Sequence, residues 1–88
     1  MPWFVKIEEG TVDKVSFDRH MSAHKAFVKE LIAKGHEART GYWSHYGDGM
    51  LLFKATSMEQ AKAIVAQDPL VQNGCVHYQL YEWCIVVE

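Results

Sequence analysis

Two amphipathic segments with helical spacing, separated by strand-like runs, limit this chain to a small number of folds. Residues 19–35 and 57–68 each place apolar side chains on one side at helical period. The strand-like runs cover residues 3–8, 37–55 and 76–87, and a turn divides the second of them. The expected order is β-α-β-β-α-β within 88 residues. This order predicts a ferredoxin-like α+β sandwich, in which a four-stranded antiparallel sheet carries two helices on one face.

The first helical segment carries histidine on its apolar side. We expect Ser16 or Asp18 to cap it after a connection over residues 11–17, and Gly35 to end it. The side chains on the apolar side are His20, His24, Phe27, Val28, Leu31 and, beside them, Ile32. Because this stripe faces a core, we expect His24 at the core's edge, where an imidazole suits proton transfer or metal binding. The structural alternative is a partly buried histidine whose hydrogen bond goes to a backbone carbonyl.

Two antiparallel strands are expected between the helices. The first covers residues 37–46, where Gly41 marks a bulge or the close approach of another group. A turn signature at Tyr46-Gly47-Asp48-Gly49-Met50 then leads to a strand over residues 50–55. The nearly continuous apolar run of that strand indicates a central position with both faces covered.

Capping residues delimit the second helix. Ser57 and Gln60 form a capping-box pattern at its start. Pro69 stops it, because the residue before a proline is biased away from helical geometry. Residues 70–74 then form a loop or a helical turn that a glycine closes.

The predicted sheet has one face under the helices and one open face. In the first strand Lys6 and Glu8 alternate with Val5 and Ile7, which indicates that one face of the strand is buried. The large side chains from which the open face would be drawn are Trp3, Tyr42, Phe53, Tyr78, Leu80 and Trp83. So much exposed apolar surface is typical of an interface. We therefore expect a second copy of the chain to pack sheet against sheet, giving a two-fold dimer with a barrel-like interior.

Charge and composition exclude several classes of partner. The formal net charge is −2, and the scattered basic residues give no footprint for nucleic acid. No continuous apolar span indicates a membrane segment, and the first residues lack the order of a signal peptide. One expected strand separates Cys75 from Cys84, so their sulfurs cannot meet. We expect one domain over residues 1–88 in a reducing cytoplasm, with two free thiols and with no cofactor assigned.

His24 and Asp68 are candidates for a catalytic pair. Both expected helices lie on one side of the sheet, so the carboxylate that ends the second helix could approach the imidazole on the first. A carboxylate that accepts from one ring nitrogen fixes the tautomer and raises the basicity of the other, as a general acid or base requires. The structural alternative is that Asp68 only caps backbone amides around Pro69.

Short motifs in a fixed order extend over nearly the whole chain. They are Arg19 before His24, then Phe27, Leu31, Gly35, Gly41, the run 55–61, Asp68-Pro69, Gly74, Tyr78 and Trp83. Each is weak by itself, but the histidine and the Asp-Pro pair in this frame make a moderately specific match. The sequence resembles the YCII-related, or YciI-like, family of small proteins.

The resemblance implies a ferredoxin-like fold that forms a dimeric α+β barrel, with a His–Asp pair that falls by position on His24 and Asp68. A related chlorohydroxyquinol dehydrochlorinase and muconolactone isomerases of similar fold imply acid–base chemistry on small organic rings. We therefore predict an enzyme of lyase or isomerase type, in which His24 transfers a proton and Asp68 orients it. The expected neighbours of the substrate are Arg19, Gly41, Tyr42 and Tyr78.

Two other functions stay open. A non-catalytic dimer could hold a small hydrophobic ligand in the same pocket. His20 and His24, one helical turn apart, could chelate a metal ion, but two ligands are too few. The side chains that could supply a third ligand are His36, His45, His77, Asp68 and Cys75. The expected partners are a second copy of the chain and a small organic molecule.

Overall fold

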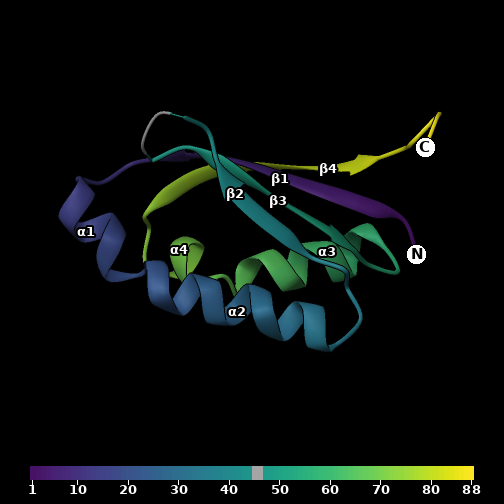
Figure 1. The fold of residues 1–88 in the computed structure, drawn as a ribbon, viewed down its shortest axis with the longest axis horizontal. Helices are drawn as coiled ribbons and strands as arrows, with labels where there is room; N and C mark the ends of the chain where they lie inside the picture. The colour runs from purple at the N-terminus through teal and green to yellow at the C-terminus, as the bar shows by residue number, and fades with distance from the viewer. Residues whose placement is uncertain (45–46) are drawn as a thin grey trace.

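An antiparallel sheet covered by helices on one face forms the protein (Figure 1), as seen in a computed structural model that describes residues 1–44 and 47–88. The elements are β1 (Trp3–Gly10), α1 (Lys14–Arg19), α2 (Met21–Ala33), β2 (Arg39–Tyr42), β3 (Gly49–Lys54), α3 (Met58–Ala66), α4 (Pro69–Gln72) and β4 (Val76–Trp83). The strand order is β2-β3-β1-β4, and every neighbouring pair is antiparallel. This arrangement confirms the predicted ferredoxin-like α+β fold. Within the described residues, no helix is both long and apolar enough to cross a membrane.

The start of the first helical segment differs from the prediction. Residues 14–19, expected in part as a connection, form the short helix α1. The expected cap, Ser16 or Asp18, is wrong: both residues lie inside α1, and its cap is Asp13, whose carboxylate accepts from the backbone N–H of Ser16 at 2.9 Å. This helix buries Phe17 against a small cluster that includes Leu70 and Cys75. The burial of that aromatic ring explains why the segment folds back onto the protein.

The prediction of a bulge or a close approach at Gly41 is wrong. The β2–β3 register runs without interruption through Gly41, which pairs with Met50, so this position has no bulge. A Cβ added at Gly41 would meet no atom within 4 Å. The close approach occurs at Gly49 across the ladder, where an added Cβ would overlap the carbonyl oxygen of Gly41 and lie 2.9 Å from Cα of Tyr42. The glycine that the packing requires is therefore the one on β3.

Strand β2 is shorter than expected. It starts at Arg39, because Glu37 has a positive φ of 49° that no strand accommodates. The expected strand extended to residue 46, and residues 45 and 46 lie outside the described residues. The predicted turn between β2 and β3 is supported by a hydrogen bond from the Trp43 N–H to the Asp48 carbonyl at 3.0 Å.

The predictions for the second helical segment are confirmed. The Ser57 hydroxyl accepts from the N–H of Gln60 at 3.1 Å, and the Gln60 side chain accepts from the N–H of Thr56 at 2.6 Å. Helix α3 stops before Asp68, and Pro69 occupies the first turn of α4, where its missing N–H costs nothing. Gly74, with a φ of 65°, closes this turn.

The buried face of β1 is its polar one. Lys6 pairs directly with Leu51 on β3 and Leu80 on β4, and Leu51 belongs to the core under the helices. Paired residues point to the same face of a sheet, so Lys6 lies on the helix side, with Phe4 and Glu8 two positions away. All three side chains are buried.

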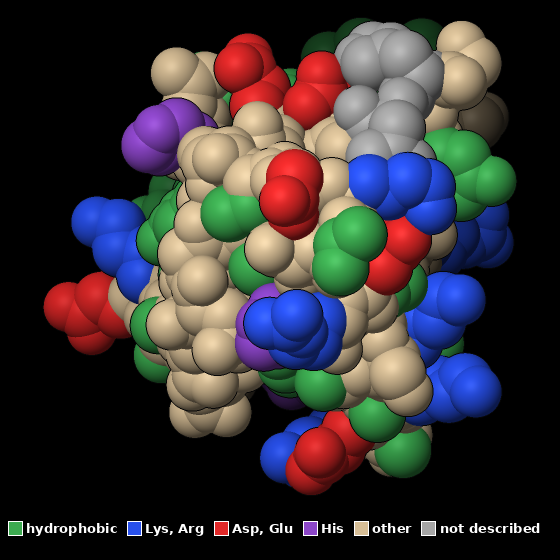
Figure 2. Space-filling model, turned by 90° about the vertical axis from the view of Figure 1, so that its left-hand side faces the viewer, with side chains coloured by type: hydrophobic (Ala, Val, Ile, Leu, Met, Phe, Trp, Pro, Cys, Tyr) green, Lys and Arg blue, Asp and Glu red, His purple; other side chains and the backbone are tan. Residues whose placement is uncertain are grey.

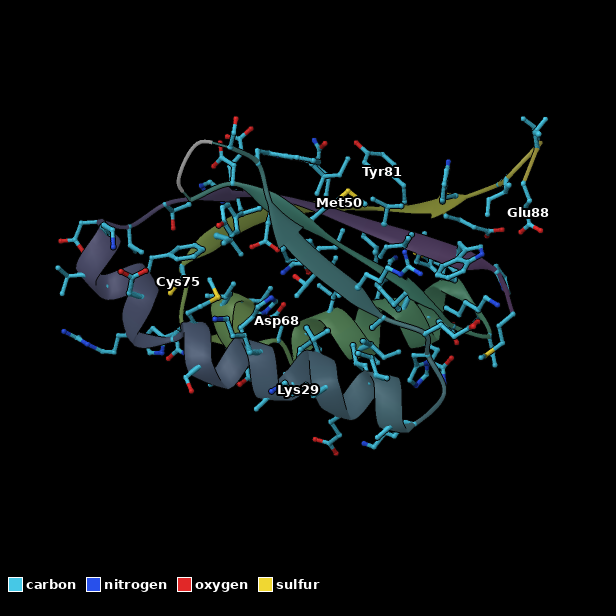
Figure 3. All side chains as sticks on the ribbon, viewed as in Figure 1. Lys29, Met50, Asp68, Cys75, Tyr81 and Glu88 are labelled. Carbon is cyan, nitrogen blue, oxygen red and sulfur yellow. The ribbon has the colours of Figure 1, made fainter. Side chains whose placement is uncertain are left out.

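The open face carries a different apolar set from the predicted one. Trp3 and Trp83, directly paired between β1 and β4, lie on it as expected. The other residues of this open-face patch are Val5, Ile7, Met50, Leu52 and Tyr81. Figure 3 shows Met50 and Tyr81 on the side of the sheet away from the helices. The four remaining predicted members lie on the helix side because their register has the opposite parity; they are Tyr42, Phe53, Tyr78 and Leu80. In the isolated chain β3 is central, as predicted, but only its helix-side residues are fully covered.

We predict that Gly49→Ala will lower the free energy of unfolding by about 1–3 kcal/mol, because the new Cβ must displace the backbone of β2. Gly41→Ala is the matched control, since its Cβ enters open space and should change stability by no more than about 1 kcal/mol. Urea unfolding of both variants measures the difference. Equal stabilities for the two variants would contradict the close packing at Gly49.

Candidate active site

Five polar side chains from four segments of the chain form one hydrogen-bonded chain under the sheet. His24 Nδ1 lies 2.8 Å from Asp68 Oδ1, which confirms the predicted contact between the two residues. Asp68 Oδ2 accepts from Lys6 Nζ at 2.8 Å, and the same Nζ donates to Glu8 Oε1 at 2.9 Å. At the other end, His24 Nε2 lies 2.9 Å from Thr40 Oγ1. We call this set the polar chain. Figure 3 shows Asp68 between the sheet and α2.

Local sequence places the two predicted partners. His24 lies one turn before Val28 on the buried side of α2 and is only 3% exposed. Asp68 caps α4, where its Oδ1 accepts from the N–H of Leu70 at 3.0 Å, and its side chain is fully buried. Asp68 therefore does cap backbone amides around Pro69, as the structural alternative in the sequence analysis had it. This capping coexists with the contact to His24, because the carboxylate has enough acceptor positions for both.

Asp68 is held in its ionised form. Burial by itself would raise the pKa of Asp68, but the hydrogen bond from His24 and the charge of Lys6 outweigh it and lower the pKa below the ordinary 3.8. An ionised Asp68 accepts the Nδ1–H proton of His24, so we assign the neutral ring an unprotonated Nε2. This is the nitrogen from which a histidine can act as a base.

Thr40 lets His24 change its protonation state without leaving a buried group unpaired. When Nε2 is unprotonated, the Thr40 hydroxyl can donate to it across 2.9 Å. When Nε2 holds a proton, the hydroxyl can accept instead and donate to the carbonyl of Met50, 3.3 Å away. The polar chain can therefore hold His24 in both states that proton transfer needs.

A cavity of about 400 Å³ lies beside the polar chain, within the range of small-molecule sites. Its wall includes Glu8, His24 and Thr40 of the polar chain. Its other lining residues are mostly apolar or lack a side chain: Phe17, Met21, Tyr42, Leu70, Gly41, Gly47 and Gly49. Its remaining lining residues are charged: Asp18, Lys25 and Asp48. Figure 2 views the α1 end of the molecule, where acidic and basic side chains are interspersed.

The predicted substrate neighbours divide into two groups. Gly41 and Tyr42 line the cavity. Arg19 is exposed at the end of α1, and Tyr78 contacts Lys6, whose Nζ lies 5.8 Å from the ring centroid; neither residue lines the cavity. The role of Arg19 and Tyr78 in substrate binding stays a prediction.

Sequence reasoning missed Lys6, Glu8 and Thr40. The only available signal was the alternation of β1, in which Lys6 and Glu8 share the parity of Phe4. That alternation indicates two faces but does not decide which one is buried. Thr40 gave no signal, because an exposed position on a short strand is ordinary for threonine.

The suggested metal pair is not assembled. His20 is the residue between α1 and α2, and both ring nitrogens of His24 already have partners in the polar chain. Across residues 1–44 and 47–88, no three histidine, cysteine or acidic side chains form a group that could hold a metal ion; His45 lies outside these residues. Burial and the nearby Asp68 charge raise the pKa of the Cys75 thiol, so it remains protonated.

Comparison with known proteins assigns the chain to a family. The sequence profile of the YCII-related domain matches residues 4–84. The chain belongs to the YCII-related family. No protein among the curated sequences matches it.

Two solved structures share its fold. One is 5-chloro-2-hydroxyhydroquinone dehydrochlorinase from Burkholderia phenoliruptrix AC1100, in complex with 2,5-dihydroxybenzoquinone, with a TM-score of 0.74, 16% identity and 93% of each chain covered. The other is the de novo designed protein Ferredog-Diesel, with a TM-score of 0.65, 14% identity, and 93% of this chain and 85% of the designed chain covered. At such identities the likeness concerns the fold, which an enzyme and a designed protein both adopt.

We predict that Lys6→Met will lower the free energy of unfolding at pH 7 by about 3–5 kcal/mol, because Asp68 and Glu8 would stay buried without their cation. The lowered pKa of Asp68 gives stability that is full above pH 3.8 and is lost as pH falls below it. The difference between wild type and Lys6→Met should therefore shrink below pH 3.8. Denaturant unfolding from pH 7 to pH 2 measures it.

Lys34→Met is the control for this experiment. It removes an exposed ion pair with Glu30, 3.0 Å long, and should cost no more than about 0.5 kcal/mol. If Lys6→Met were equally mild, or if its cost did not change with pH, the buried ion pair would not have the role described.

Proposed function

We propose that this YCII-related protein is an acid–base enzyme of lyase or isomerase type that acts on a small organic molecule. The observation that carries the proposal is the Asp68–His24 contact, which leaves Nε2 as the basic nitrogen of a ring in the cavity wall. In this role His24 transfers the proton and Asp68 orients the ring. The family and the dehydrochlorinase of similar fold support enzymatic activity.

The reaction would begin with removal of a proton from a hydroxyl group or an acidic C–H of the substrate by Nε2, directly or through the Thr40 hydroxyl. The proton would return to another position in an isomerisation, or stay on His24 while a leaving group takes its bonding electrons in an elimination. Asp68 would stabilise the imidazolium that forms in between. Gly41 and Tyr42 would contact the substrate from β2.

The lining of the cavity supports a neutral, ring-sized substrate. The described residues that line it carry three carboxylates, Glu8, Asp18 and Asp48, and one ammonium, that of Lys25. Lys6 pairs with Glu8 and the adjacent Asp68, and Lys14 pairs with Asp18, so four carboxylates face three ammonium groups. The excess negative charge disfavours a carboxylate or phosphate in the cavity. The dihydroxybenzoquinone bound to the dehydrochlorinase is a ring of this size.

We predict that His24→Ala will lower kcat/KM by about 10²–10⁴-fold, the usual contribution of a positioned acid or base. The assay follows chloride release from 5-chloro-2-hydroxyhydroquinone and, for substrates without chlorine, deuterium uptake from D₂O into cyclic monoketones. His20→Ala is the matched control, because it removes an imidazole one turn away that does not line the cavity.

A non-catalytic ligand-binding protein is the second candidate function. It is favoured by the burial of His24, whose Nε2 already has Thr40 as a partner. In that case no substrate would turn over, and ligands would bind His24→Ala as tightly as wild type. Turnover that is equal in wild type and His24→Ala would remove His24 from the mechanism.

The open-face patch supports a homodimer formed sheet against sheet. It includes Trp3, Trp83 and Tyr81, each of which is at least partly exposed in the single chain. A second copy would cover this surface and give β3 its expected second cover. Both cysteines are free, which is compatible with the proposed cytoplasmic location.

We predict that Trp83→Glu will convert the dimer to a monomer, since a carboxylate would be buried in an apolar contact. Val15→Glu is the control, because Val15 is 70% exposed on α1 and lies off this face. Light scattering coupled to size exclusion gives the mass of each variant. A wild-type protein that is monomeric at micromolar concentration would contradict the dimer.

A further inference from the structure

The cavity wall contains a second carboxylate that His24 chemistry does not use. Glu8 is 5% exposed and lines the cavity from β1. Its Oε1 accepts from Lys6 Nζ at 2.9 Å. Among the described residues, no side chain or backbone group donates to Oε2. Every fully buried side-chain nitrogen or oxygen there has a hydrogen-bond partner, so Oε2 must have contact with the cavity.

Structural needs do not account for this carboxylate. Lys6 already has an ion-pair partner in Asp68, at 2.8 Å. Adding Glu8 places two carboxylates on one ammonium and leaves an excess negative charge in a buried place, which is unfavourable. A fully buried oxygen needs a hydrogen-bond partner inside the protein, whereas an oxygen at the cavity surface can take its partner from a ligand. A free carboxylate oxygen in a mostly apolar wall is therefore a candidate ligand contact.

We propose that Glu8 is a second substrate-contacting residue, whose Oε2 accepts a hydrogen bond from a hydroxyl group of a neutral ring that carries at least two hydroxyl groups. One hydroxyl meets Glu8, and another oxygen function faces His24 and Thr40. This inference rests on the proposed function in one respect, since the ligand occupies the same cavity; it does not require turnover.

Charge selects this ligand class. Glu8 and Asp68 outnumber Lys6, so the polar chain has one net negative charge when His24 is neutral. An anionic ligand would be repelled, and an ether or a halogen could not donate to Oε2. A hydroxyl group can donate without bringing charge. The carboxylate thus distinguishes dihydroxylated rings from rings with a single hydroxyl group.

The test compares the binding of phenol, catechol, resorcinol and hydroquinone by NMR titration. In wild type, at least one of the three diols should bind about tenfold or more tightly than phenol, as expected for a hydrogen bond to a charged group. In Glu8→Gln this preference should disappear, because the amide oxygen takes the place of Oε1 at Lys6 and the NH₂ group faces the cavity. Unchanged phenol binding shows that the cavity is intact.

Glu9→Gln is the matched control. It makes the same change of charge on the adjacent residue, which is exposed and has the opposite parity on β1, and it should keep the diol preference. If Glu8→Gln does not fold, the ¹³C carboxyl resonance of Glu8 in wild type gives the answer, since it should move with a diol and not with phenol.

Equal binding of phenol and all diols to wild type, or a diol preference that survives Glu8→Gln, would overturn the role of Glu8. Neither result concerns turnover. The proposed function fails separately, if His24→Ala keeps full activity.

Discussion

The ion pair between Lys6 and Asp68 is the interaction on which the site depends. It joins the centre of β1 to the turn between α3 and α4, two segments 62 residues apart in sequence. A buried ion pair stabilises a protein little more than apolar side chains of similar volume would. Removing one partner is costly, however, because it leaves an unpaired charge buried. The helices must therefore dock where the Asp68 carboxylate reaches Nζ. In that position the same carboxylate meets His24 on α2 and caps α4.

Because the polar side of β1 is buried, the two faces of the sheet have different chemical character. The helix side holds the polar chain and the cavity, while the open side holds the apolar patch. Proton transfer is favoured where water is scarce and partners are fixed, as they are around His24. Association is favoured where large apolar side chains are exposed, as Tyr81 and Trp83 are.

Much of the fold could be predicted from local signals. The capping residues at Ser57, the proline at 69 and the helical period around Val28 act over a few residues, so the sequence displays them directly. The helix α1 was missed because its stability comes from Phe17 packing on residues more than 50 positions away, such as Leu70. The constraint at Gly49 was assigned to Gly41 because only strand pairing reveals which glycine the neighbouring backbone approaches.

The sequence by itself determined the order of elements, the capping of the second helical segment, and a histidine and an aspartate that helix packing brings together. The tertiary structure alone decided which face of β1 is buried, and so added Lys6, Glu8 and Thr40 to the pair. Alternation along a strand divides residues into two faces, but only pairing with Leu51 and Leu80 orients them. From the sequence, Lys6 and Glu8 look like ordinary exposed residues of a strand. In the folded protein both are buried and belong to the polar chain.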